Sequence, residues 1–349
     1  HNPKEYNGYK VYWEDGAQLP PKHADAVAAE MNRIDIFNDI KIANFDEAVA
    51  SGMIQIMGKE TDEAFLECAL GQVIYQEEID KAADVKIVFT PFHGTGHILV
   101  PEALKRAGFK NIFPVEEQMV IDGNFPTVAS PNPENPEGFY LGVELADKVG
   151  SDLIIGTDPD ADRIGVMVRG ADGKFLPNTA NQMGALLLDY ILTAYEETGS
   201  MPAHPYAVKT IVSTELAAAI CAAHNVTMHN VLTGFKFIGE QIAILEEKGE
   251  ADRYIFGFEE SYGYLKGTYA RDKDAVVASM LICEMTAYYK AKGMTLGDAL
   301  QGLYARYGYC YETNVEIYME GLDGAARMAA MMDTLRNNPP AEFGGVAVE

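Results

Sequence analysis

The sequence is poor in positive charge. Its 349 residues include 27 Lys and Arg against 52 Asp and Glu, which gives a formal net charge of −25 at pH 7. Nucleic acids and anionic membrane surfaces are bound through clustered cations, so we expect neither as a partner. A small phosphorylated molecule is still compatible with this charge, because a few cations can converge locally on an acidic protein.

Cysteine and long apolar runs are scarce as well. There are four cysteines, and their spacing excludes a Cys-x-x-Cys metal or redox motif. Scattered cysteines in a chain of this size are typical of the reducing cytoplasm, where we expect the protein to reside. No run approaches the roughly 20 apolar residues of a membrane span, and the polar first residues show no signal peptide.

The sequence does contain apolar, β-branched runs that alternate with helical patterns. We expect a strand at residues 85–89, a helix at 100–107 and a strand at 111–115. This order predicts an α/β fold with a mostly parallel sheet. A polar break at residues 170–174 suggests a domain boundary, and a second unit of the same kind follows it. The other expected elements are strands at 9–13, 153–156, 164–168, 208–212, 227–231, 254–256 and 313–318, and helices at 23–32, 63–81, 140–148, 179–196, 215–224 and 324–336.

An acidic loop follows directly on one of the expected buried strands. Asp158, Asp160 and Asp162 alternate there. Alternation places three carboxylates on one side of an extended turn, where they repel one another unless a cation lies among them. Mg²⁺ prefers such oxygen ligands, and the adjacent Arg163 could hold a phosphate oxygen. The loop therefore predicts a divalent-metal site.

Other interpretations of this loop compete with the metal site. A solvated acidic turn is disfavoured by its position, because α/β proteins bind ligands at the carboxyl ends of strands. A calcium EF-hand is excluded, since its sixth and twelfth positions would be Arg163 and Arg169 instead of Gly and Glu. A phosphatase that uses an Asp as its nucleophile remains open.

Four further segments accompany the acidic loop, at residues 1–10, 90–96, 233–239 and 257–263. The last reads Gly-Phe-Glu-Glu-Ser-Tyr-Gly and, with the acidic loop, is the most specific. In content and order these segments resemble the α-D-phosphohexomutase family, which includes phosphoglucomutases and phosphomannomutases. The Gly-Phe-Glu-Glu-Ser-Tyr-Gly form is most similar to the phosphoglucomutase branch that also includes phosphopentomutase-active members.

The resemblance implies consecutive phosphohexomutase-type α/β domains with mixed, mostly parallel sheets, arranged as four domains around a deep cleft. On this basis the chain comprises the C-terminal remainder of domain 1 (residues 1–62), domain 2 with the metal-binding loop (63–172), domain 3 with the sugar-binding loop (173–302) and the start of an incomplete domain 4 (303–349).

The resemblance also implies a function. Members of the family are Mg²⁺-dependent intramolecular phosphotransferases that interconvert hexose 1-phosphate and hexose 6-phosphate through a phosphoserine enzyme and a bisphosphate intermediate. The implied ligands are a phosphosugar, Mg²⁺ and an activator of the glucose 1,6-bisphosphate type, and the implied assembly is a monomer or homodimer. The implied site residues are the metal ligands Asp158, Asp160 and Asp162, the catalytic residues His1, Lys10 and Arg163, and the substrate contacts Lys236, on a loop, Glu259 and Ser261.

Two parts of the family pattern are not among these residues. The family's nucleophilic serine stands directly before the position of His1, and the phosphate-binding loop of the fourth domain, of the Arg-Thr-Ser-Gly-Thr-Glu-Pro type, does not occur. We therefore expect little or no mutase activity from this polypeptide alone. The alternatives are a phosphomannomutase, a phosphopentomutase, a metal-dependent phosphatase and a non-catalytic phosphosugar- or metal-binding protein.

Two other polar features are expected to have structural roles. His93 lies between Phe92 and Gly94, and we expect it to shape a turn. Residues 272–274 read Asp-Lys-Asp, and we expect them to form a charge cluster at the surface or at a helix start, with contact to the cleft as the less favoured alternative.

Overall fold

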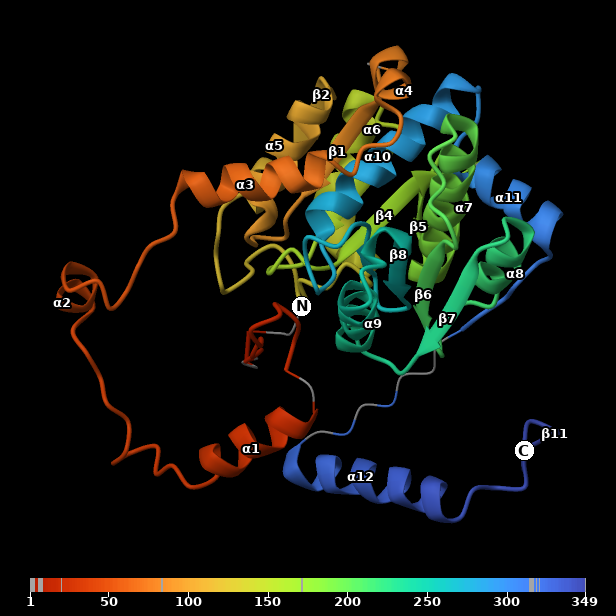
Figure 1. The fold of residues 1–349 in the computed structure, drawn as a ribbon. Coiled ribbons are helices and arrows are strands. Elements are labelled where there is room, and N and C mark those ends of the chain that lie inside the picture. Colours follow the sequence, from red (N-terminus) through yellow and green to blue (C-terminus); the bar gives the residue numbers. More distant parts are fainter. Residues whose placement is uncertain are drawn as a thin grey trace. The chain divides into compact units, whose positions relative to one another are not determined.

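The protein is represented by a computed structural model that describes residues 4–5, 9–19, 21–82, 84–170, 172–313, 317, 319 and 321–348. The chain divides into two units, His1–Cys310 and Tyr311–Glu349. Figure 1 draws the fold with its elements labelled. Because the expected strand at residues 313–318 falls largely on residues outside the described ones, the structure does not test it.

A five-stranded mixed sheet forms the first half of the larger unit, in the order β2-β1-β3-β4-β5. Strands β2, β1 and β3 are parallel, while β4 and β5 run antiparallel to their neighbours. The continuous burial of β3 explains its apolar sequence, since a strand covered on both faces has no need of alternation. The bounds are β1 Lys86–Thr90, β2 Asn111–Pro114, β3 Leu153–Thr157, β4 Ile164–Arg169 and β5 Phe175–Asn178.

A four-stranded mixed sheet forms the second half, in the order β7-β6-β8-β9. Strands β7, β6 and β8 are parallel, and β9 pairs antiparallel with β8. The predicted α/β fold with mixed, mostly parallel sheets is therefore confirmed. The bounds are β6 Tyr206–Thr210, β7 Thr227–Val231, β8 Tyr254–Glu259 and β9 Gly263–Leu265.

Helices connect and cover the strands of the larger unit. They are α1 Pro21–Met31, α2 Phe45–Ala50, α3 Lys59–Leu70, α4 Gln76–Lys81, α5 Gly96–Ala107, α6 Tyr140–Val149, α7 Ala180–Thr198, α8 Leu216–Ala223, α9 Phe235–Glu247, α10 Ala275–Ala291 and α11 Leu296–Tyr307, with short 3₁₀ turns η1 Glu116–Gln118, η2 Pro136–Phe139 and η3 Ala251–Arg253. The smaller unit contains α12 Gly321–Asn337 and a short hairpin of β10 Glu342–Phe343 and β11 Val346–Ala347. No helix in the described part of the chain combines the length and apolar character that crossing a bilayer requires.

One hydrophobic cluster contains residues of both sheets of the larger unit. It contains Phe89 of β1, Leu187 of α7, Phe256 of β8 and Met280 of α10. Helix α10 is buried along almost its whole length and contacts α4, α5 and α7. Because packed interiors resist deformation, this shared core fixes the ends of β3 and β8 relative to each other.

The expected helix at residues 63–81 is wrong in one respect, because two helices with a break replace it. Helix α3 ends at Leu70 and α4 begins at Gln76. Within the break, the backbone N–H groups of Ile74 and Tyr75 donate to Oε1 of Glu284 at 3.0 and 2.7 Å. A buried carboxylate on α10 thus replaces the helical partners of these two groups, which overrides local helix propensity.

One other expectation differs from the structure. The strand expected at residues 9–13 is reduced to an isolated bridge between Tyr12 and Gln18. The polar break at residues 170–174 lies between β4 and β5, and the first sheet continues to Asn178, while the domain boundary expected at the break stays a prediction. Helix α9 was not expected at all. The division into family domains is untested and stays a prediction.

Candidate functional site

The acidic loop lies at the carboxyl end of β3, in the turn that leads into β4. Oδ1 of Asp158 accepts hydrogen bonds from the backbone N–H groups of Asp162 and Arg163, both at 3.0 Å. The backbone N–H of Asp158 in turn donates to the carbonyl of Arg163 at 3.3 Å. Asp158 is completely buried, so this carboxylate organises the loop from the inside.

The three carboxylates converge closely enough to share a cation. Asp158, Asp160 and Asp162 each offer a ligand oxygen, and these oxygens lie within 4.8 Å of one another. Oδ2 of Asp158 and Oδ1 of Asp162 are buried without a hydrogen-bond partner among the described residues. A buried, unsatisfied carboxylate oxygen is costly. The residues present therefore fit a hard divalent cation such as Mg²⁺, which binds through oxygen ligands.

The electrostatics of the loop agree with this interpretation. Burial raises the pKa of Asp158 well above its usual range, and the neighbouring charges of Asp162 and Asp160 raise it further. Burial is the largest influence on Asp160 and raises its pKa, but the hydrogen bond and the charge of Lys10, together with the hydrogen bond to Asp158, leave the pKa lowered overall. Carboxylates that cannot all ionise comfortably without a counter-charge are typical of ion-binding and catalytic sites.

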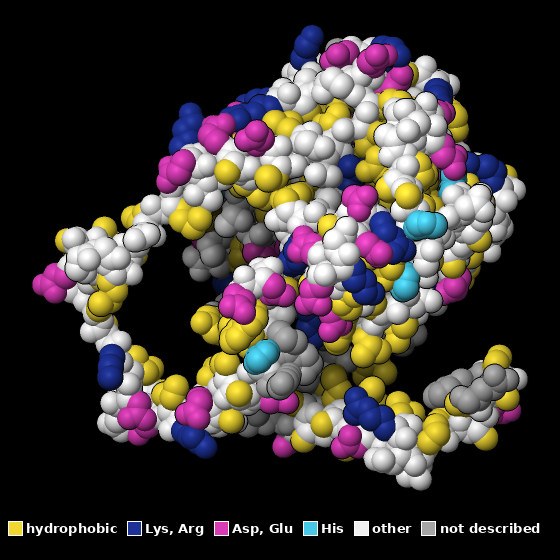
Figure 2. Space-filling view, in the orientation of Figure 1, with side chains coloured by type: hydrophobic (Ala, Val, Ile, Leu, Met, Phe, Trp, Pro, Cys, Tyr) yellow, Lys and Arg dark blue, Asp and Glu magenta, His cyan; other side chains and the backbone are white. Residues whose placement is uncertain are grey.

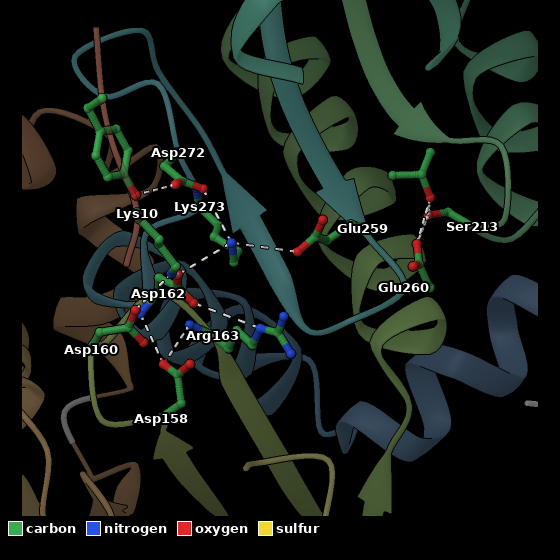
Figure 3. A network of polar contacts seen from close by, with 12 residues as sticks. Lys10, Asp158, Asp160, Asp162, Arg163, Ser213, Glu259, Glu260, Asp272 and Lys273 are labelled. Carbon is green, nitrogen blue, oxygen red and sulfur yellow. Dashed lines mark hydrogen bonds and ion pairs between the residues drawn. The ribbon is translucent and has the colours of Figure 1, made fainter. Parts of the chain in front are cut away.

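Lys10 supplies one such counter-charge. Its Nζ donates to Oδ2 of Asp160 at 2.8 Å and to Oδ2 of Asp162 at 2.6 Å, as Figure 3 shows. Partial burial lowers the pKa of Lys10, but the two carboxylates outweigh burial and raise it overall. The structure thus brings Lys10 to the acidic loop from a position 150 residues away in the sequence.

A second loop lies against the acidic loop through its backbone. Strand β8 ends at Glu259, and the turn at residues 260–262 leads into β9. Arg163 and Gly263 form an antiparallel bridge, and the N–H of Ile164 donates to the carbonyl of Tyr262 at 3.1 Å. The distance between the two most specific motifs of the sequence is therefore set by main-chain bonds.

Lys273 lies between these two loops. Its Nζ is 3.3 Å from Oδ2 of Asp162, 3.3 Å from Oδ1 of Asp272 and 3.9 Å from Oε1 of Glu259. Burial lowers the pKa of Lys273, and the three carboxylates raise it beyond that loss. Burial also raises the pKa of Glu259, while Lys273 opposes the effect. Figure 3 shows the ammonium between the carboxylates.

From the sequence, Lys273 was expected mainly at the surface or at a helix start, whereas the structure places it beside Asp162. The helix-start role expected for residues 272–274 is correct for Asp274, whose carboxylate accepts from the N–H groups of Val276 and Val277 at the start of α10. The Lys273 side chain, however, is only 10% exposed and reaches the site. No local pattern signals this placement, because it depends on where the start of α10 meets the acidic loop.

The other expected site residues are placed differently. Lys236 lies in the first turn of α9 and not on a loop, which corrects the expectation. It lines a pocket of about 140 Å³ with Asp15 and Glu240. No hydrogen bond or ion pair between described residues joins Lys236 to the acidic loop. Ser261 is half-buried, and a hydrogen bond with it lowers the pKa of Glu259 against the effect of burial.

His1 lies outside the described residues. The Nε of Arg163 is buried 3.8 Å from Oδ1 of Asp162 and has no hydrogen-bond partner among the described residues. As expected, His93 shapes a turn, since it is buried in a left-handed conformation with φ 65°. The roles assigned to the individual site residues stay predictions.

A cavity of about 490 Å³ opens beside the acidic loop. Such a volume is in the range of small-molecule sites. Its wall combines the acidic loop with the segment before α10 and the start of α5. Its lining includes Asp15, Thr95, Gly96, Asp160, Asp162, Arg271, Asp272 and Lys273.

Comparison with known families gives a consistent result along the chain. Residues 63–173 match the α/β/α domain II of phosphoglucomutase/phosphomannomutase, and residues 179–307 match domain III. Residues 1–36 match domain I of the same family. The acidic loop thus falls in the part that matches domain II, and the Glu259 loop in the part that matches domain III.

Curated relatives agree with the family models. A phosphoglucomutase of Staphylococcus aureus (strain MRSA252) is 38% identical over 351 residues, and one of Staphylococcus haemolyticus (strain JCSC1435) is 35% identical over 348 residues. Both alignments cover 100% of this chain and 61% of the relative. The chain therefore spans about three fifths of the length of these relatives.

Solved structures show the same fold. A phosphoglucomutase/phosphomannomutase family protein from Burkholderia thailandensis matches 81% of this chain and 52% of its own, with a TM-score of 0.55 and 18% identity. The open form of parafusin, a phosphoglucomutase from Paramecium, matches 72% of this chain and 42% of its own, with a TM-score of 0.53 and 16% identity. Taken with the matching domain models and the curated relatives, the fold and the joined loops show that this chain belongs to the phosphoglucomutase/phosphomannomutase family.

Proposed function

We propose that this chain provides the metal-binding and sugar-binding loops of a Mg²⁺-dependent hexose-phosphate mutase, with glucose phosphates as its substrates. The observation that carries the proposal is the joining of the two loops, in which Asp162 of the acidic loop and Glu259 approach Lys273 from opposite sides. Glucose is favoured because the curated relatives at 35–38% identity are named phosphoglucomutases.

The proposed division of labour follows from the chemistry of each group. Asp158, Asp160 and Asp162 would hold Mg²⁺, which when bound neutralises charge on the oxygens of a transferred phosphoryl group. Arg163 and Lys273 place two further cations beside the same carboxylates. Phosphoryl transfer needs little more than such positioning and charge neutralisation.

The remaining groups would orient the sugar and move its proton. Glu259 and Ser261 offer hydrogen-bonding oxygens at the end of β8, suited to sugar hydroxyls. Lys10 is the proposed proton-transfer residue. The two carboxylates favour its ammonium form, so it would first give its proton to the oxygen that leaves the transferred phosphoryl group and then take up the proton that the attacking sugar hydroxyl releases. Lys236, on α9, is proposed as a more distant contact of the substrate.

A titration tests the binding part of this proposal. We expect the chain to bind glucose 6-phosphate more tightly with Mg²⁺ than with EDTA, as measured by phosphorus NMR. Asp160→Asn should lose at least about tenfold in Mg²⁺ affinity, because one of three carboxylate ligands becomes neutral. Asp172→Asn, on the exposed turn between β4 and β5, is the matched control.

A coupled assay tests the chemical part. We expect little or no conversion of glucose 1-phosphate to glucose 6-phosphate by this polypeptide alone, even with glucose 1,6-bisphosphate present. Release of free phosphate from either sugar phosphate would instead support a metal-dependent phosphatase. Failure to bind any hexose phosphate in the presence of Mg²⁺ would contradict the proposed function itself.

A further inference from the structure

Glu260 follows the proposed sugar-binding residue Glu259 but faces a different group of side chains. Its Oε2 accepts a hydrogen bond from Oγ1 of Thr210 at 2.6 Å, and Oγ of Ser213 lies 3.5 Å away. In Figure 3, Glu259 points toward Lys273, whereas Glu260 points toward Ser213. The two neighbouring carboxylates therefore serve different parts of the structure.

The hydroxyl groups in this cluster form an ordered chain of donors. Thr210 is completely buried and Ser213 is 4% exposed, so each hydroxyl needs a partner within the protein. A threonine hydroxyl has one hydrogen, which Thr210 gives to Glu260. The 2.7 Å contact between Oγ1 of Thr210 and Oγ of Ser213 must then be donated by Ser213. Both hydroxyls thus point their hydrogens in the direction of the carboxylate.

The support for this cluster is rigid. Thr210 is the last residue of β6, which is the parallel neighbour of β8 in the second sheet. The loop after Thr210 is held by Lys209, whose fully buried Nζ donates to the carbonyl of Ser213 at 3.0 Å and to Oε1 of Glu215 at 2.8 Å. Glu260 is therefore bound to a fixed point of the sheet and not to a loose surface loop.

The other end of the turn is fixed independently. Tyr262 has a left-handed backbone with φ 66°, which a tyrosine adopts only when its surroundings require it. The next residue, Gly263, has no room for a side chain, since an added Cβ would lie 2.5 Å from Cδ of Lys273. Gly263 also forms the bridge with Arg163. The turn is thus anchored at Glu260 on one side and at residues 262–263 on the other.

We propose that Glu260 is a positioning residue that holds Glu259 and Ser261 in place for the sugar by anchoring their turn to Thr210 and Ser213. This inference deepens the proposed function and, for the sugar itself, rests on it. Glu260 touches no substrate in this account and acts only through the position of its neighbours.

Hydrogen–deuterium exchange tests the anchoring without any ligand. Glu260→Ala should increase exchange at the amides of residues 259–263 and leave the core strands unchanged. Glu260→Gln keeps an acceptor for Thr210 and should restore slow exchange. Thr210→Val removes the donor but keeps the shape, so it should reproduce the effect of Glu260→Ala. Unchanged exchange at residues 259–263 in both Glu260→Ala and Thr210→Val overturns the inference.

A binding experiment tests the consequence for the sugar. With Mg²⁺ present, Glu260→Ala should weaken glucose 6-phosphate binding about tenfold, as expected for hydrogen bonds lost with a misplaced loop. Binding of inorganic phosphate and of Mg²⁺ alone should stay within about twofold of the parent chain. Glu260→Gln should recover most of the loss. Glu247→Ala, at the exposed end of α9, removes the same charge and serves as the control.

The outcomes separate this inference from the proposed function. If the parent chain binds no glucose 6-phosphate while exchange at residues 259–263 responds as described, the proposed function fails. The anchoring of the turn by Glu260 is then supported, but its role in sugar binding is not. If the parent binds and Glu260→Ala weakens all three ligands equally, the positioning role is overturned in favour of a general structural effect. If Glu260→Ala binds like the parent, the inference is overturned outright.

Discussion

The Nζ of Lys10 lies 2.6 Å from Oδ2 of Asp162, on a carboxylate that we propose as a metal ligand. The ammonium and a divalent cation would therefore compete for the same negative charge. We expect Lys10→Met to bind Mn²⁺ about tenfold more tightly than the parent chain, because a competing cation is removed from partly buried carboxylates. Electron paramagnetic resonance of free Mn²⁺ measures this affinity directly.

The control for this prediction is Lys41→Met, which removes the same charge at an exposed position. An affinity in Lys10→Met equal to that of the control, or weaker, would show that Lys10 supports the metal site instead of competing with it.

The buried Asp158 carboxylate predicts a trade-off between stability and metal binding. Its pKa is raised in the folded chain, so the folded state holds this proton more tightly than the unfolded state does. Stability is then lost as the pH rises above the unfolded pKa, and ionised Asp158 costs stability near pH 7. We expect Asp158→Asn, in EDTA, to melt at least about 2 °C higher than the parent.

The same variant should no longer be stabilised by Mg²⁺, whereas the parent should be. Thermal unfolding with EDTA and with added Mg²⁺ measures both effects. Asp172→Asn controls for the loss of one negative charge. A melting temperature of Asp158→Asn at or below that of the parent in EDTA would contradict the electrostatic account of this loop.

Substitution of Glu284, which lies away from the acidic loop, is predicted to have a large effect on stability. Its Oε1 accepts from the N–H groups of Ile74 and Tyr75 and, at 2.7 Å, from the hydroxyl of Tyr190. Glu284→Ala would leave these buried donors without a partner, so we expect it to lower the free energy of unfolding by about 2–4 kcal/mol. Urea denaturation provides the measurement.

Glu284→Gln should be much milder, because its amide oxygen can accept the same three hydrogen bonds. Glu144→Ala, on the exposed face of α6, gives the baseline for losing a helical glutamate. Equal losses in Glu284→Ala and Glu144→Ala would mean that the break between α3 and α4 does not depend on this carboxylate.

From the burial of Lys266 we predict that the stability of the folded chain depends on pH in the alkaline range. Its Nζ is buried and donates to the carbonyl of Gln72 at 2.9 Å, and burial lowers its pKa to about 8. Between this value and the ordinary 10.5, the folded chain binds fewer protons than the unfolded chain. Stability therefore rises with pH across this window, whereas charged Lys266 costs stability below it.

We expect the free energy of unfolding of the parent to rise from pH 8 to pH 10 relative to that of Lys266→Met, which cannot titrate. Denaturation at a series of pH values tests the difference. Lys105 is exposed on α5, so the free energy of unfolding of Lys105→Met should change with pH in the same way as that of the parent. If the free energy of unfolding of Lys266→Met also changed with pH in the same way as that of the parent, the lowered pKa of Lys266 would be ruled out.

The parts that could be predicted from the sequence are those whose physics is local. Asp158, Asp160 and Asp162 lie next to one another in the chain, and the strand before them is apolar throughout, so both the ligand type and its place at a strand end could be predicted. The α/β class followed in the same way from alternating apolar runs. The α/β class and the position of the acidic loop at the end of β3 are confirmed because no distant residue was needed to define them, whereas the metal-binding role of the loop stays a prediction.

The parts that could not be predicted depend on distant contacts. The break between α3 and α4 is set by Glu284, some 210 residues further along the chain. Lys273 enters the site because the start of α10 meets the acidic loop, where the N–H of Ala275 donates to the carbonyl of Ala161 at 3.1 Å. Helix α9 was missed because its first turn had been taken as a loop of the resemblance. Tertiary context decided each of these positions.

Figure 2 shows charged side chains of both signs on the face that it draws, whereas the buried cluster that contains Phe89 and Phe256 is apolar. Because Phe89 and Phe256 belong to one core, the two sheets that carry the acidic loop and the Glu259 turn are joined by shared packing. A mutase of the proposed kind must present both ends of a sugar bisphosphate to one phosphoryl-transfer centre. If the chain acts as proposed, such a bisphosphate would reorient beside two loops that the bridge between Arg163 and Gly263 holds together.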